Sequence, residues 1–397
     1  MTPAARLAAA ADILDTLDLS RPVEAQLRVW ARGNRYAGSK DRRAIADRIY
    51  TIIRRRRSAA LQGGGETGRA LVLGSLIAAD GLPLDAVEAL CSGGYGLATL
   101  SEAERETLSR EPAWPGDAAR LDWPEWLMDA ARAVFGEAVE AELDALRQRA
   151  PVDLRVNTLK ATPEQALAAL HAEGLEAVPL DRPNALRLHP AAPVLNSRAW
   201  REGMVELQDA GSQAVATLTD AAPGEVVLDY CAGGGGKTLA LAAMMQNEGR
   251  LLAHDVDPAR MADLPQRAAR AGATCITALP DPAQVAGECD RVLVDAPCSG
   301  SGSWRRDAAG KWRLTAEGLN ALTAMQDAAL DGAARCVRPG GVLVYATCSV
   351  LRVENEARVD AFLLRHPEFT RGQALRLYPG RDGCDGFFAA CLDLTMR

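Results

Sequence analysis

The pattern of apolar and polar positions divides the chain into three stretches. Residues 1–110 repeat their apolar positions at steps of three and four, as in LAAAADILDTLDL and RRAIADRIYTII, and show no convincing strand. This pattern predicts an all-helical domain over residues 1–110. The helical pattern continues beyond it, with one helix beginning at the proline of WPEWLMDAARAVF and continuing through EAVEAELDALRQR.

A short alternation of strands with one helix follows these helices. VDLRVN, LEAVPL and ALRLHP alternate in the manner of half-buried strands. The helix between the first two has an N-cap at Thr162, a proline at its first position (Pro163), a capping box closed by Gln165 and a stop at Gly174. We therefore predict a second region, residues 111–205, made of a helical linker and a small α+β subdomain.

The remaining residues, 206–397, alternate between apolar strands and helices. The predicted strands are EVVLDY (225–230), RLLAHD (250–255), RVLVD (291–295), GVLVYAT (341–347) and, near the end, GFFAACLDL. Helical stretches lie between them, notably at 238–246 and 316–335. This alternation is typical of a parallel sheet covered on both faces. The predicted fold class is α/β, a doubly wound sheet preceded by the small α+β piece and the all-helical domain.

Composition narrows the class of protein. A chain of 397 residues exceeds what one core usually supports, and 48% hydrophobic and 24% charged residues are ordinary for a soluble globular protein. Nine cysteines without a CxxC pair indicate a reducing compartment, and four scattered histidines argue against a metal site. Acidic residues interrupt the alanine-rich start, and no window is apolar enough to cross a membrane. We therefore expect a cytoplasmic protein without a metal.

The charge is distributed unevenly along the chain. The net charge is −7, yet residues 1–57 hold thirteen Lys or Arg against six Asp or Glu. The densest part is IIRRRR, residues 52–57. A basic first domain suits an electrostatic docking surface for nucleic acid, whereas a solvated helix end explains the same run equally well.

A glycine-rich turn follows the first strand of the α/β region. Residues 231–238 read CAGGGGKT, and glycines let the backbone approach a ligand at the start of a helix. Asp255 ends the next strand, where an acidic side chain accepts hydrogen bonds from ribose hydroxyl groups. NAD, FAD and S-adenosylmethionine all use this arrangement, whereas the spacing GGGGKT does not fit a P-loop. The candidate cofactor-binding residues are Cys231, Ala232, Gly233, Gly234, Gly235, Gly236, Lys237, Asp255 and Asp295.

Two cysteines follow two strands of the predicted sheet. Cys298 follows the strand at 291–294, and Cys348 follows the strand at 341–346. Because parallel strands end at one edge, both thiols should lie at the edge of the glycine-rich turn. One cysteine alone is more often a small buried hydrophobe, but two at a cofactor site indicate chemistry. Cys231 is expected to pack beneath the cofactor, and Cys91, Cys275, Cys289, Cys336, Cys384 and Cys391 are expected to be structural.

Several stretches resemble the RNA cytosine-5 methyltransferases, in particular the bacterial RsmB (Sun/Fmu) type. They are VLDYCAGGGGKT, DRVLVDAPCSGSG, WRRDAAGKWRLT and VLVYATCSVLRVENE, with DLRVNTLK, ELQDAGSQ and DGFFAACL in support. The basic helical start resembles the family's NusB-like RNA-binding domain more loosely. The chain departs from the family at Gly233 and Gly234, which replace alanine and proline. It also has Ala278 and Leu279 where the family has an acidic residue near adenine, for which Asp281 is a candidate substitute.

The resemblance implies a reaction and its residues. The cofactor would be S-adenosylmethionine and the product 5-methylcytosine in RNA, with 16S ribosomal RNA as the favoured partner. Cys348 would bond to C6 of the base and so activate C5, and Cys298 would assist release of the product. Asp295 would hydrogen-bond the base near N3 and N4.

Further basic and aromatic residues follow the first cysteine, namely Trp304, Arg305, Arg306, Lys311, Trp312 and Arg313. They would grip phosphate and stack on a displaced base, or else form part of a core and a solvated turn. The alternative functions are a non-catalytic RNA-binding factor in ribosome assembly and a transfer RNA cytosine-5 methyltransferase. A DNA cytosine-5 methyltransferase is disfavoured, because its ENV acid and its target-recognition region are not seen. The sequence does not predict the oligomeric state.

Overall fold

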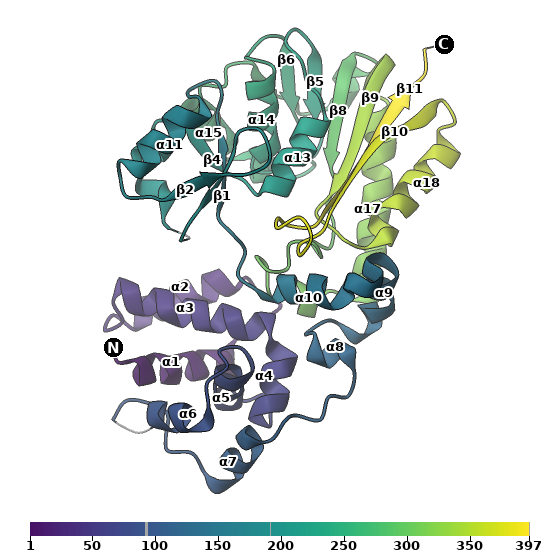
Figure 1. The fold of residues 1–397 in the computed structure, drawn as a ribbon. Coiled ribbons are helices and arrows are strands. Elements are labelled where there is room, and N and C mark those ends of the chain that lie inside the picture. The colour runs from purple at the N-terminus through teal and green to yellow at the C-terminus, as the bar shows by residue number, and fades with distance from the viewer. Residues whose placement is uncertain (92–93, 191, 397) are drawn as a thin grey trace. The chain divides into compact units, whose positions relative to one another are not determined.

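The computed structural model describes residues 1–91, 94–190 and 192–396, which divide into two units (Figure 1). The first unit contains Met1–Arg149 and Trp304–Leu314, and the second contains Ala150–Ser303 and Thr315–Arg397. A helical N-terminal part, a small α+β piece and a larger α/β sheet are all present, so the predicted fold class is confirmed. The helices between residues 111 and 149 group with the N-terminal helices, not with the small sheet.

The first unit is helical throughout its described residues. Its helices are α1 (Pro3–Thr16), α2 (Val23–Gly33), α3 (Ser39–Arg54), α4 (Arg56–Gly63), α5 (Gly68–Ala78), α6 (Leu84–Leu90), α7 (Glu102–Ser109), α8 (Asp117–Arg120), α9 (Met128–Phe135), α10 (Val139–Arg147) and α16 (Gly310–Arg313), with 3-10 turns η1 (Glu125–Leu127) and η2 (Gly136–Ala138). The apolar stripe of α3, including Ile45, Ile49 and Ile52, is fully buried against α1 and α5.

The helix expected to continue from WPEWLMDAARAVF into EAVEAELDALRQR is interrupted. α9 ends at Phe135 because Gly136 has a φ of +56°, outside the right-handed helical region. The 3-10 turn η2 follows, and α10 starts again at Val139. The prediction of one continuous helix was wrong, because the apolar repeat runs on through the glycine without marking the turn.

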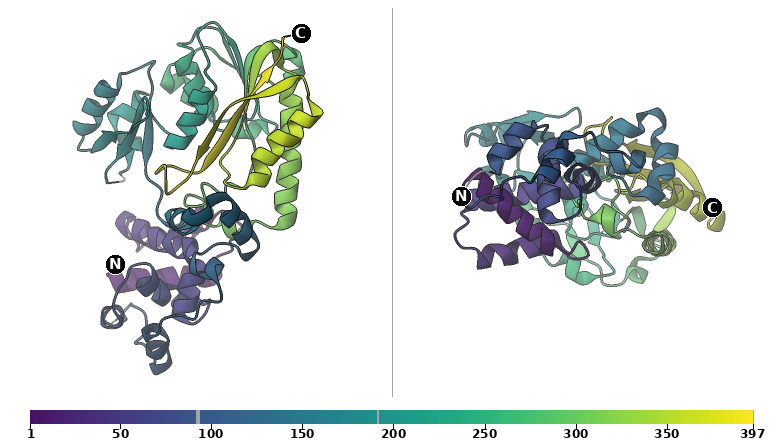
Figure 2. Two further views of the ribbon diagram at one scale, coloured as in Figure 1. Left: turned by 45° about the vertical axis from the view of Figure 1, so that its right-hand side comes forward. Right: turned by 90° about the horizontal axis from the view of Figure 1, so that it is seen from below.

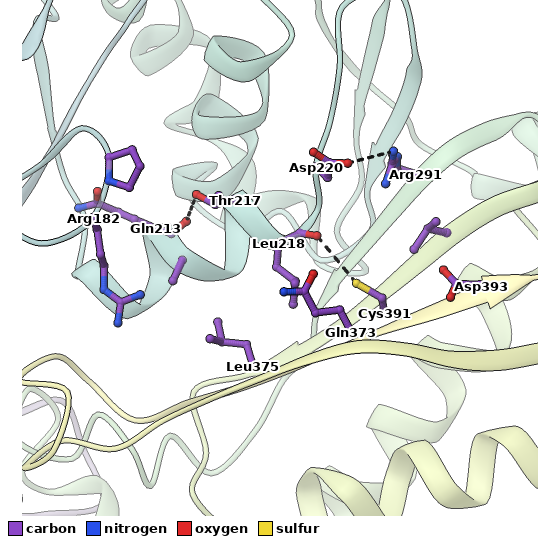
Figure 3. A pocket seen from close by; sticks show the side chains of 13 residues that line it. Arg182, Gln213, Thr217, Leu218, Asp220, Arg291, Gln373, Leu375, Cys391 and Asp393 are labelled. Carbon is purple, nitrogen blue, oxygen red and sulfur yellow. Dashed lines mark hydrogen bonds and ion pairs between the residues drawn. The ribbon is translucent and has the colours of Figure 1, made fainter.

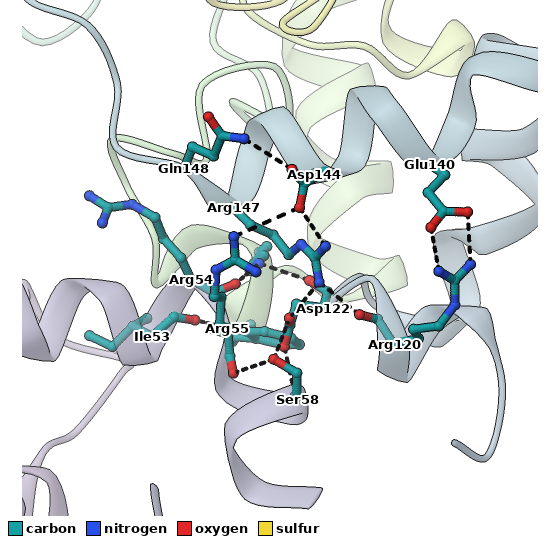
Figure 4. A network of polar contacts seen from close by, with 12 residues as sticks. Ile53, Arg54, Arg55, Ser58, Arg120, Asp122, Glu140, Asp144, Arg147 and Gln148 are labelled. Carbon is teal, nitrogen blue, oxygen red and sulfur yellow. Dashed lines mark hydrogen bonds and ion pairs between the residues drawn. The ribbon is translucent and has the colours of Figure 1, made fainter. Parts of the chain in front are cut away.

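The arginine run at residues 54–57 is bonded within the helical unit. Its partners are the Arg305 carbonyl oxygen for Arg54 (2.7 Å), Asp144 for Arg55 (3.7 Å), Glu66 for Arg56 (3.0 Å) and Glu125 for Arg57 (3.5 Å). Figure 4 shows the polar network beside it, in which Asp144 also binds Arg147, and buried Asp122 accepts hydrogen bonds from Ser58 and Arg147. The run is therefore structural, and the alternative of a docking surface at IIRRRR is disfavoured.

The basic and aromatic stretch WRRDAAGKWRL is part of the same unit. Trp304 is 1% exposed, and its ring centroid lies 4.8 Å from that of Trp123. The ammonium group of Lys311 donates to the backbone oxygens of Arg54 and Asp122 at 2.6 and 2.8 Å. Burial lowers the pKa of Lys311 to about 7. Both side chains are used inside the unit, so of the two alternatives left open by the sequence, the structural one holds for Trp304 and Lys311.

The second unit begins with a four-stranded antiparallel sheet in the order β2-β3-β1-β4. Its elements are β1 (Asp153–Val156), α11 (Pro163–His171), β2 (Ala177–Pro179), β3 (Ala185–Leu188), η3 (Val194–Asn196), α12 (Arg198–Arg201) and β4 (Val205–Leu207). The predicted capping box is present, since Thr162 Oγ1 accepts a hydrogen bond from the Gln165 N–H at 3.3 Å. β4 was not predicted from the sequence, whereas the equally short β2 was.

A seven-stranded sheet forms the rest of the unit, in the order β10-β11-β9-β8-β5-β6-β7. Its strands are β5 (Val226–Asp229), β6 (Arg250–Ala253), β7 (Ile276–Ala278), β8 (Cys289–Asp295), β9 (Val337–Thr347), β10 (Phe369–Leu377) and β11 (Phe387–Leu394). The strands from β5 to β9 run parallel, and β11 runs antiparallel to both of its neighbours. The five predicted strands are confirmed. β7 is too short to recognise in the sequence, and a register shift interrupts β10.

Helices cover both faces of this sheet (Figures 1 and 2). They are α13 (Ala210–Leu218), α14 (Gly236–Met244), α15 (Leu264–Ala271), α17 (Ala316–Ala334) and α18 (Glu356–Arg365), with the turns η4 (Pro258–Met261), η5 (Pro282–Val285) and η6 (Arg352–Glu354). Val292 and Leu343 pack with α17 and α18, whereas the adjacent Leu293 and Val344 pack with α13 and α14. The central strands are therefore buried on both faces, and ligands can approach only at a sheet edge.

The glycine Gly74 on α5 permits a close contact with α4. A Cβ atom at this position would lie 2.0 Å from the Ala59 carbonyl oxygen. We expect Gly74→Ala to reduce the free energy of unfolding by about 1–3 kcal/mol, although alanine is the better helix former. Urea denaturation of the full chain followed by circular dichroism measures this. Gly33→Ala is the control, because a Cβ at that position meets no atom within 4 Å; equal effects of the two substitutions would contradict the explanation.

Candidate active site

The two predicted cysteines lie next to each other at the carboxyl edge of the seven-stranded sheet. Cys298 follows β8, Cys348 follows β9, and their sulfur atoms are 3.5 Å apart. The register accounts for this proximity, because Asp295 at the end of β8 lies opposite Ala346 of the parallel strand β9. Both side chains are only partly buried. The sheet therefore places two accessible thiols in contact.

The surroundings of the two thiols make them chemically different. The pKa of Cys348 is lowered, first because Cys298 donates a hydrogen bond to it, and also because Ser303 and Lys237 stabilise its thiolate against burial and the charge of Asp295. The pKa of Cys298 is raised well above its ordinary value by the same hydrogen bond and by burial. Cys348 is therefore the better thiolate, and Cys298 is the thiol that retains its proton.

A buried carboxylate, Glu354, holds the two cysteine loops together. Its side chain is inaccessible to solvent. The Ser299 N–H, next to Cys298, donates to Glu354 Oε1 at 2.8 Å, and the hydroxyl groups of Ser299 and Ser349 both donate to Oε2. Since Ser299 and Ser349 each follow one of the cysteines, one side chain fixes both loops.

A second set of contacts fixes Glu354 itself. Gln326 of α17 donates to Glu354 Oε1 at 3.0 Å and to the Pro297 carbonyl oxygen at 2.9 Å. The Tyr345 hydroxyl of β9 donates to the Glu354 backbone oxygen at 2.6 Å. Glu354 was not predicted as a site residue from the sequence. Its place in VLRVENE was the available signal, but an acidic residue in a polar stretch does not reveal that it is buried.

Asp295 and Lys237 form an ion pair at the same edge. Lys237 Nζ lies 2.6 Å from Asp295 Oδ2, and 5.4 Å from the centre of the Phe387 ring. Burial by itself would lower the pKa of Lys237, but the attraction of Asp295 raises it overall. The Asp295 side chain is 31% exposed, so it remains accessible to a ligand while Lys237 holds it.

The glycine-rich turn is closed by a carboxylate. Asp255 Oδ2 accepts a hydrogen bond from the Gly233 N–H at 2.9 Å, and Oδ1 accepts one from the Asp257 N–H at 3.0 Å. The Asp255 side chain is 1% exposed and also pairs with Arg260 at 3.2 Å, while Arg260 is 54% exposed. A ribose hydroxyl could reach Asp255 only if Arg260 moved aside. Asp281, the substitute considered for the acid near adenine, accepts a hydrogen bond from the Ala283 N–H at the start of η5.

The turn itself suits a bound cofactor. Gly235 has a φ of +80°, and a Cβ there would lie 2.3 Å from Leu264 Cδ1. At the end of β5, buried Asp229 accepts a hydrogen bond from Thr238 at 2.7 Å, while its other oxygen has no hydrogen-bond partner. Burial raises the pKa of Asp229 to about 7. The unpartnered oxygen of Asp229 lies beside the glycine-rich turn and the start of α14. A ligand that carries a positive charge and hydroxyl groups could supply the missing hydrogen bond there.

Other features of the second unit lie away from the thiols. A hollow of about 580 Å³ is lined by residues of α13 with Leu375 and Cys391 (Figure 3). Its lining includes Arg291 and Val342, which lie four and five residues before the ends of β8 and β9, so it is a separate feature. Cys231 is partly buried next to the glycine turn, and burial raises its pKa.

Residues 1–91, 94–190 and 192–396 contain neither a metal-binding cluster nor a membrane-spanning helix. No group of three or more His, Cys, Asp or Glu side chains in these ranges is arranged to hold a metal ion. No helix there is both long and apolar enough to cross a membrane.

Comparisons with known proteins show which families the chain resembles. A family model described as 16S rRNA methyltransferase RsmB/F matches residues 216–393, and one described as an RsmF/B-like ferredoxin-like domain matches residues 123–195. The first match includes both cysteine loops. It also includes the glycine-rich turn and the ion pair of Asp295 with Lys237.

Individual relatives agree with the family match. The chain is 40% identical over 312 residues to ribosomal RNA small subunit methyltransferase B of Xylella fastidiosa strain 9a5c, covering 74% of this chain and 72% of the relative. It is 32% identical over 432 residues to the protein of the same name from Xanthomonas campestris pv. campestris, covering 98% and 97%. A crystal structure of a methyltransferase homologue from Pyrococcus horikoshii has a TM-score of 0.62 and 26% identity, covering 70% of this chain and 97% of that one.

The hydrogen bond between the thiols predicts a shift in reactivity. In Cys298→Ala the donor to Cys348 is lost, so the pKa of Cys348 should rise and its thiolate fraction at neutral pH should fall. We expect the pH midpoint for alkylation of Cys348 by iodoacetamide, followed by peptide mass spectrometry, to move to higher pH. Cys275→Ala, which removes another partly buried cysteine, is the control. An unchanged or lower midpoint in Cys298→Ala would contradict the assigned hydrogen bond.

The buried carboxylate predicts a loss of stability on an isosteric change. Glu354→Gln replaces an acceptor oxygen with an amide that faces hydrogen-bond donors, leaving at least one buried donor without a partner. We expect the free energy of unfolding to fall by about 1–3 kcal/mol in urea denaturation. Glu317→Gln, at an exposed position on α17, should leave it unchanged. A Glu354→Gln variant as stable as the unsubstituted chain would refute the role of Glu354 as a clamp.

Proposed function

Because the chain belongs to the RsmB/F family of methyltransferases, we propose that it methylates C5 of cytosine in 16S ribosomal RNA. Its methyl donor is S-adenosylmethionine, which supplies an electrophilic methyl group on a sulfonium. The nucleic acid is carried over from the description of the family and from the names of the relatives. We further propose that the protein acts in the cytoplasm.

The contact between the two thiols is the observation that carries the cytosine-5 assignment. C5 of cytosine is too weak a nucleophile to take a methyl group directly, and a thiolate added to C6 makes it an enamine carbon that can. After transfer, the C5 proton must leave so that the thiolate can depart and the ring regain its double bond. Attack requires one thiol to be ionised, whereas release requires a second group that handles the C5 proton. Two adjacent thiols with different pKa values can divide these two tasks.

The roles of the two cysteines follow from their environments. Cys348, with the lowered pKa, is the nucleophile that adds to C6. Cys298 lies 3.5 Å away and keeps its proton while Cys348 is a thiolate. Once Cys348 is bonded to C6 that negative charge is gone, so Cys298 can lose its proton to solvent and accept the C5 proton. The C6–S bond then breaks, the ring regains its double bond, and Cys348 leaves as a thiolate. The reverse assignment would require attack by the thiol whose environment opposes ionisation.

Asp295 would orient the target base. Its carboxylate is exposed at the mouth of the site and would hydrogen-bond the cytosine near N3 and N4, where charge develops when C6 is attacked. Lys237 Nζ donates a hydrogen bond to it at 2.6 Å and so fixes the direction of the carboxylate. The methyl donor would be held by residues Cys231 to Lys237, which form the glycine-rich turn and the start of α14, together with Asp255. The target base must leave its stack to reach this edge.

The two alternatives use the same surface differently. A non-catalytic assembly factor would need neither the contact between the thiols nor their unlike environments. A transfer RNA methyltransferase would use the same chemistry on another RNA. Bisulfite sequencing of total RNA from cells with and without the protein separates these possibilities: loss of a 16S mark supports the proposal, whereas loss of a transfer RNA mark alone, or of none, overturns it.

The covalent mechanism predicts different outcomes for the two cysteines. We expect Cys348→Ala to abolish methyl transfer from S-adenosylmethionine to 16S RNA transcript and to form no adduct. Cys298→Ala should retain a protein–RNA adduct that survives denaturing gel electrophoresis, because attack proceeds and release does not. Cys275→Ala should behave as the unsubstituted protein. An adduct in Cys348→Ala that is absent in Cys298→Ala would reverse the roles.

A further inference from the structure

A basic hollow lies on the helical unit, away from the arginine run that the sequence emphasises. It has a volume of about 610 Å³ and is lined by Arg28, Ala31, Arg32, Arg35 and Arg42. Three of the arginines come from α2 and the turn after it, and the fourth from the first turns of α3. All four arginines are exposed.

Most of these cations are not neutralised within the protein. Arg28 pairs with Glu24 at 3.5 Å with both side chains mostly exposed, and the Arg42 Nε–H donates to the Ala37 carbonyl oxygen. Within the described parts of the chain, Arg32 and Arg35 make no ion pair or hydrogen bond. Like charges gathered on one surface repel one another, so the arrangement is favourable only when an anion joins it.

The arginines at residues 54–57 differ from those of the hollow because they are paired within the protein. Those four arginines bind carboxylates or a carbonyl group of their own unit. The acid nearest in sequence to the hollow, Asp41, is 8% exposed and is bound by Arg6 and the N-terminal amine. The excess positive charge of residues 1–57 is therefore displayed at α2 and the start of α3.

An exposed aromatic side chain adjoins the arginines. Tyr36 follows Arg35 directly and is 67% exposed, as is Val29 on α2. The start of α3 adds the exposed cations Lys40 and Arg43. Guanidinium forks bind phosphate in two places at once, and an exposed aromatic ring offers a face on which a base can stack. Exposed cations beside an aromatic ring are typical of sites that bind single-stranded RNA.

We propose that the hollow formed by Arg28, Arg32, Arg35 and Arg42 binds the phosphate backbone of single-stranded RNA, with Tyr36 stacking on a base. The inference rests on the proposed function, in which the substrate is RNA, and it names the surface that grips it. An acidic protein partner would be attracted by the same charge but would not use the exposed ring or distinguish RNA length.

The test compares two triple variants of equal charge. Arg28→Ala with Arg32→Ala and Arg35→Ala removes the hollow, whereas Arg105→Ala with Arg110→Ala and Arg132→Ala removes arginines of the same unit that are paired with Glu88, Glu106 and Asp117. Binding of 16S RNA transcript is measured by filter retention from low to high KCl. We expect the hollow variant to bind at least about tenfold more weakly, and its log–log salt slope to fall by about 2, since each single-strand phosphate contact contributes roughly 0.7.

The remaining outcomes separate this inference from the proposed function. Equal loss in both triple variants, or loss in neither, overturns the hollow as an RNA site. Tyr36→Ala should weaken binding without changing the salt slope, and an unchanged affinity overturns the stacking contact. Filter retention is measured without S-adenosylmethionine and so does not depend on methyl transfer. A protein that retains the transcript but does not methylate it therefore condemns the proposed chemistry and leaves the binding result standing. Tighter retention of polyglutamate than of RNA would favour a protein partner and overturn the inference.

Discussion

The contact between two sulfur atoms, 3.5 Å apart across neighbouring strands, is the feature on which the proposed chemistry depends. Identical side chains cannot divide two tasks unless their surroundings differ. Here the register of β8 and β9 brings them together, and Lys237 and Ser303 on one side and Glu354 on the other make them unequal. A slip of one residue in that register would turn one thiol to the opposite face of the sheet.

Much of the fold could be predicted from the sequence because its central strands are long apolar runs buried on both faces. β4 and β7 were missed; each has three residues, and β2, which is equally short, was recognised within the longer alternation LEAVPL. The break at Gly136 is set by a single backbone angle. The same topological rule that located the sheet predicted that Cys298 and Cys348 would meet at one edge. Glu354 escaped prediction because burial, not residue type, gives a carboxylate its role.

Charge was the least informative feature of the sequence. The side chains of the densest basic run, residues 54–57, are bonded within the protein; Arg54, for example, donates to the Arg305 carbonyl oxygen, 251 residues along the chain. By contrast, Arg32 of α2 and Arg35 after it form no ion pair within the described residues, and Arg28 pairs only with the exposed Glu24 of its own helix. A count of lysines and arginines measures net charge over a segment, whereas an electrostatic surface depends on which of those charges remain after the fold has formed its own ion pairs.

The chain passes between its two units three times, because Trp304–Leu314 leaves the sheet unit just after the Cys298 loop and returns at Thr315. Ala308 and Ala309 of this excursion belong to the helical core. A gene divided after residue 149 would thus not yield two self-sufficient proteins: the helical product would lack part of its interior, and the other would display a tryptophan-bearing loop with nothing to bury it. The helical unit therefore needs this excursion of the chain to complete its core.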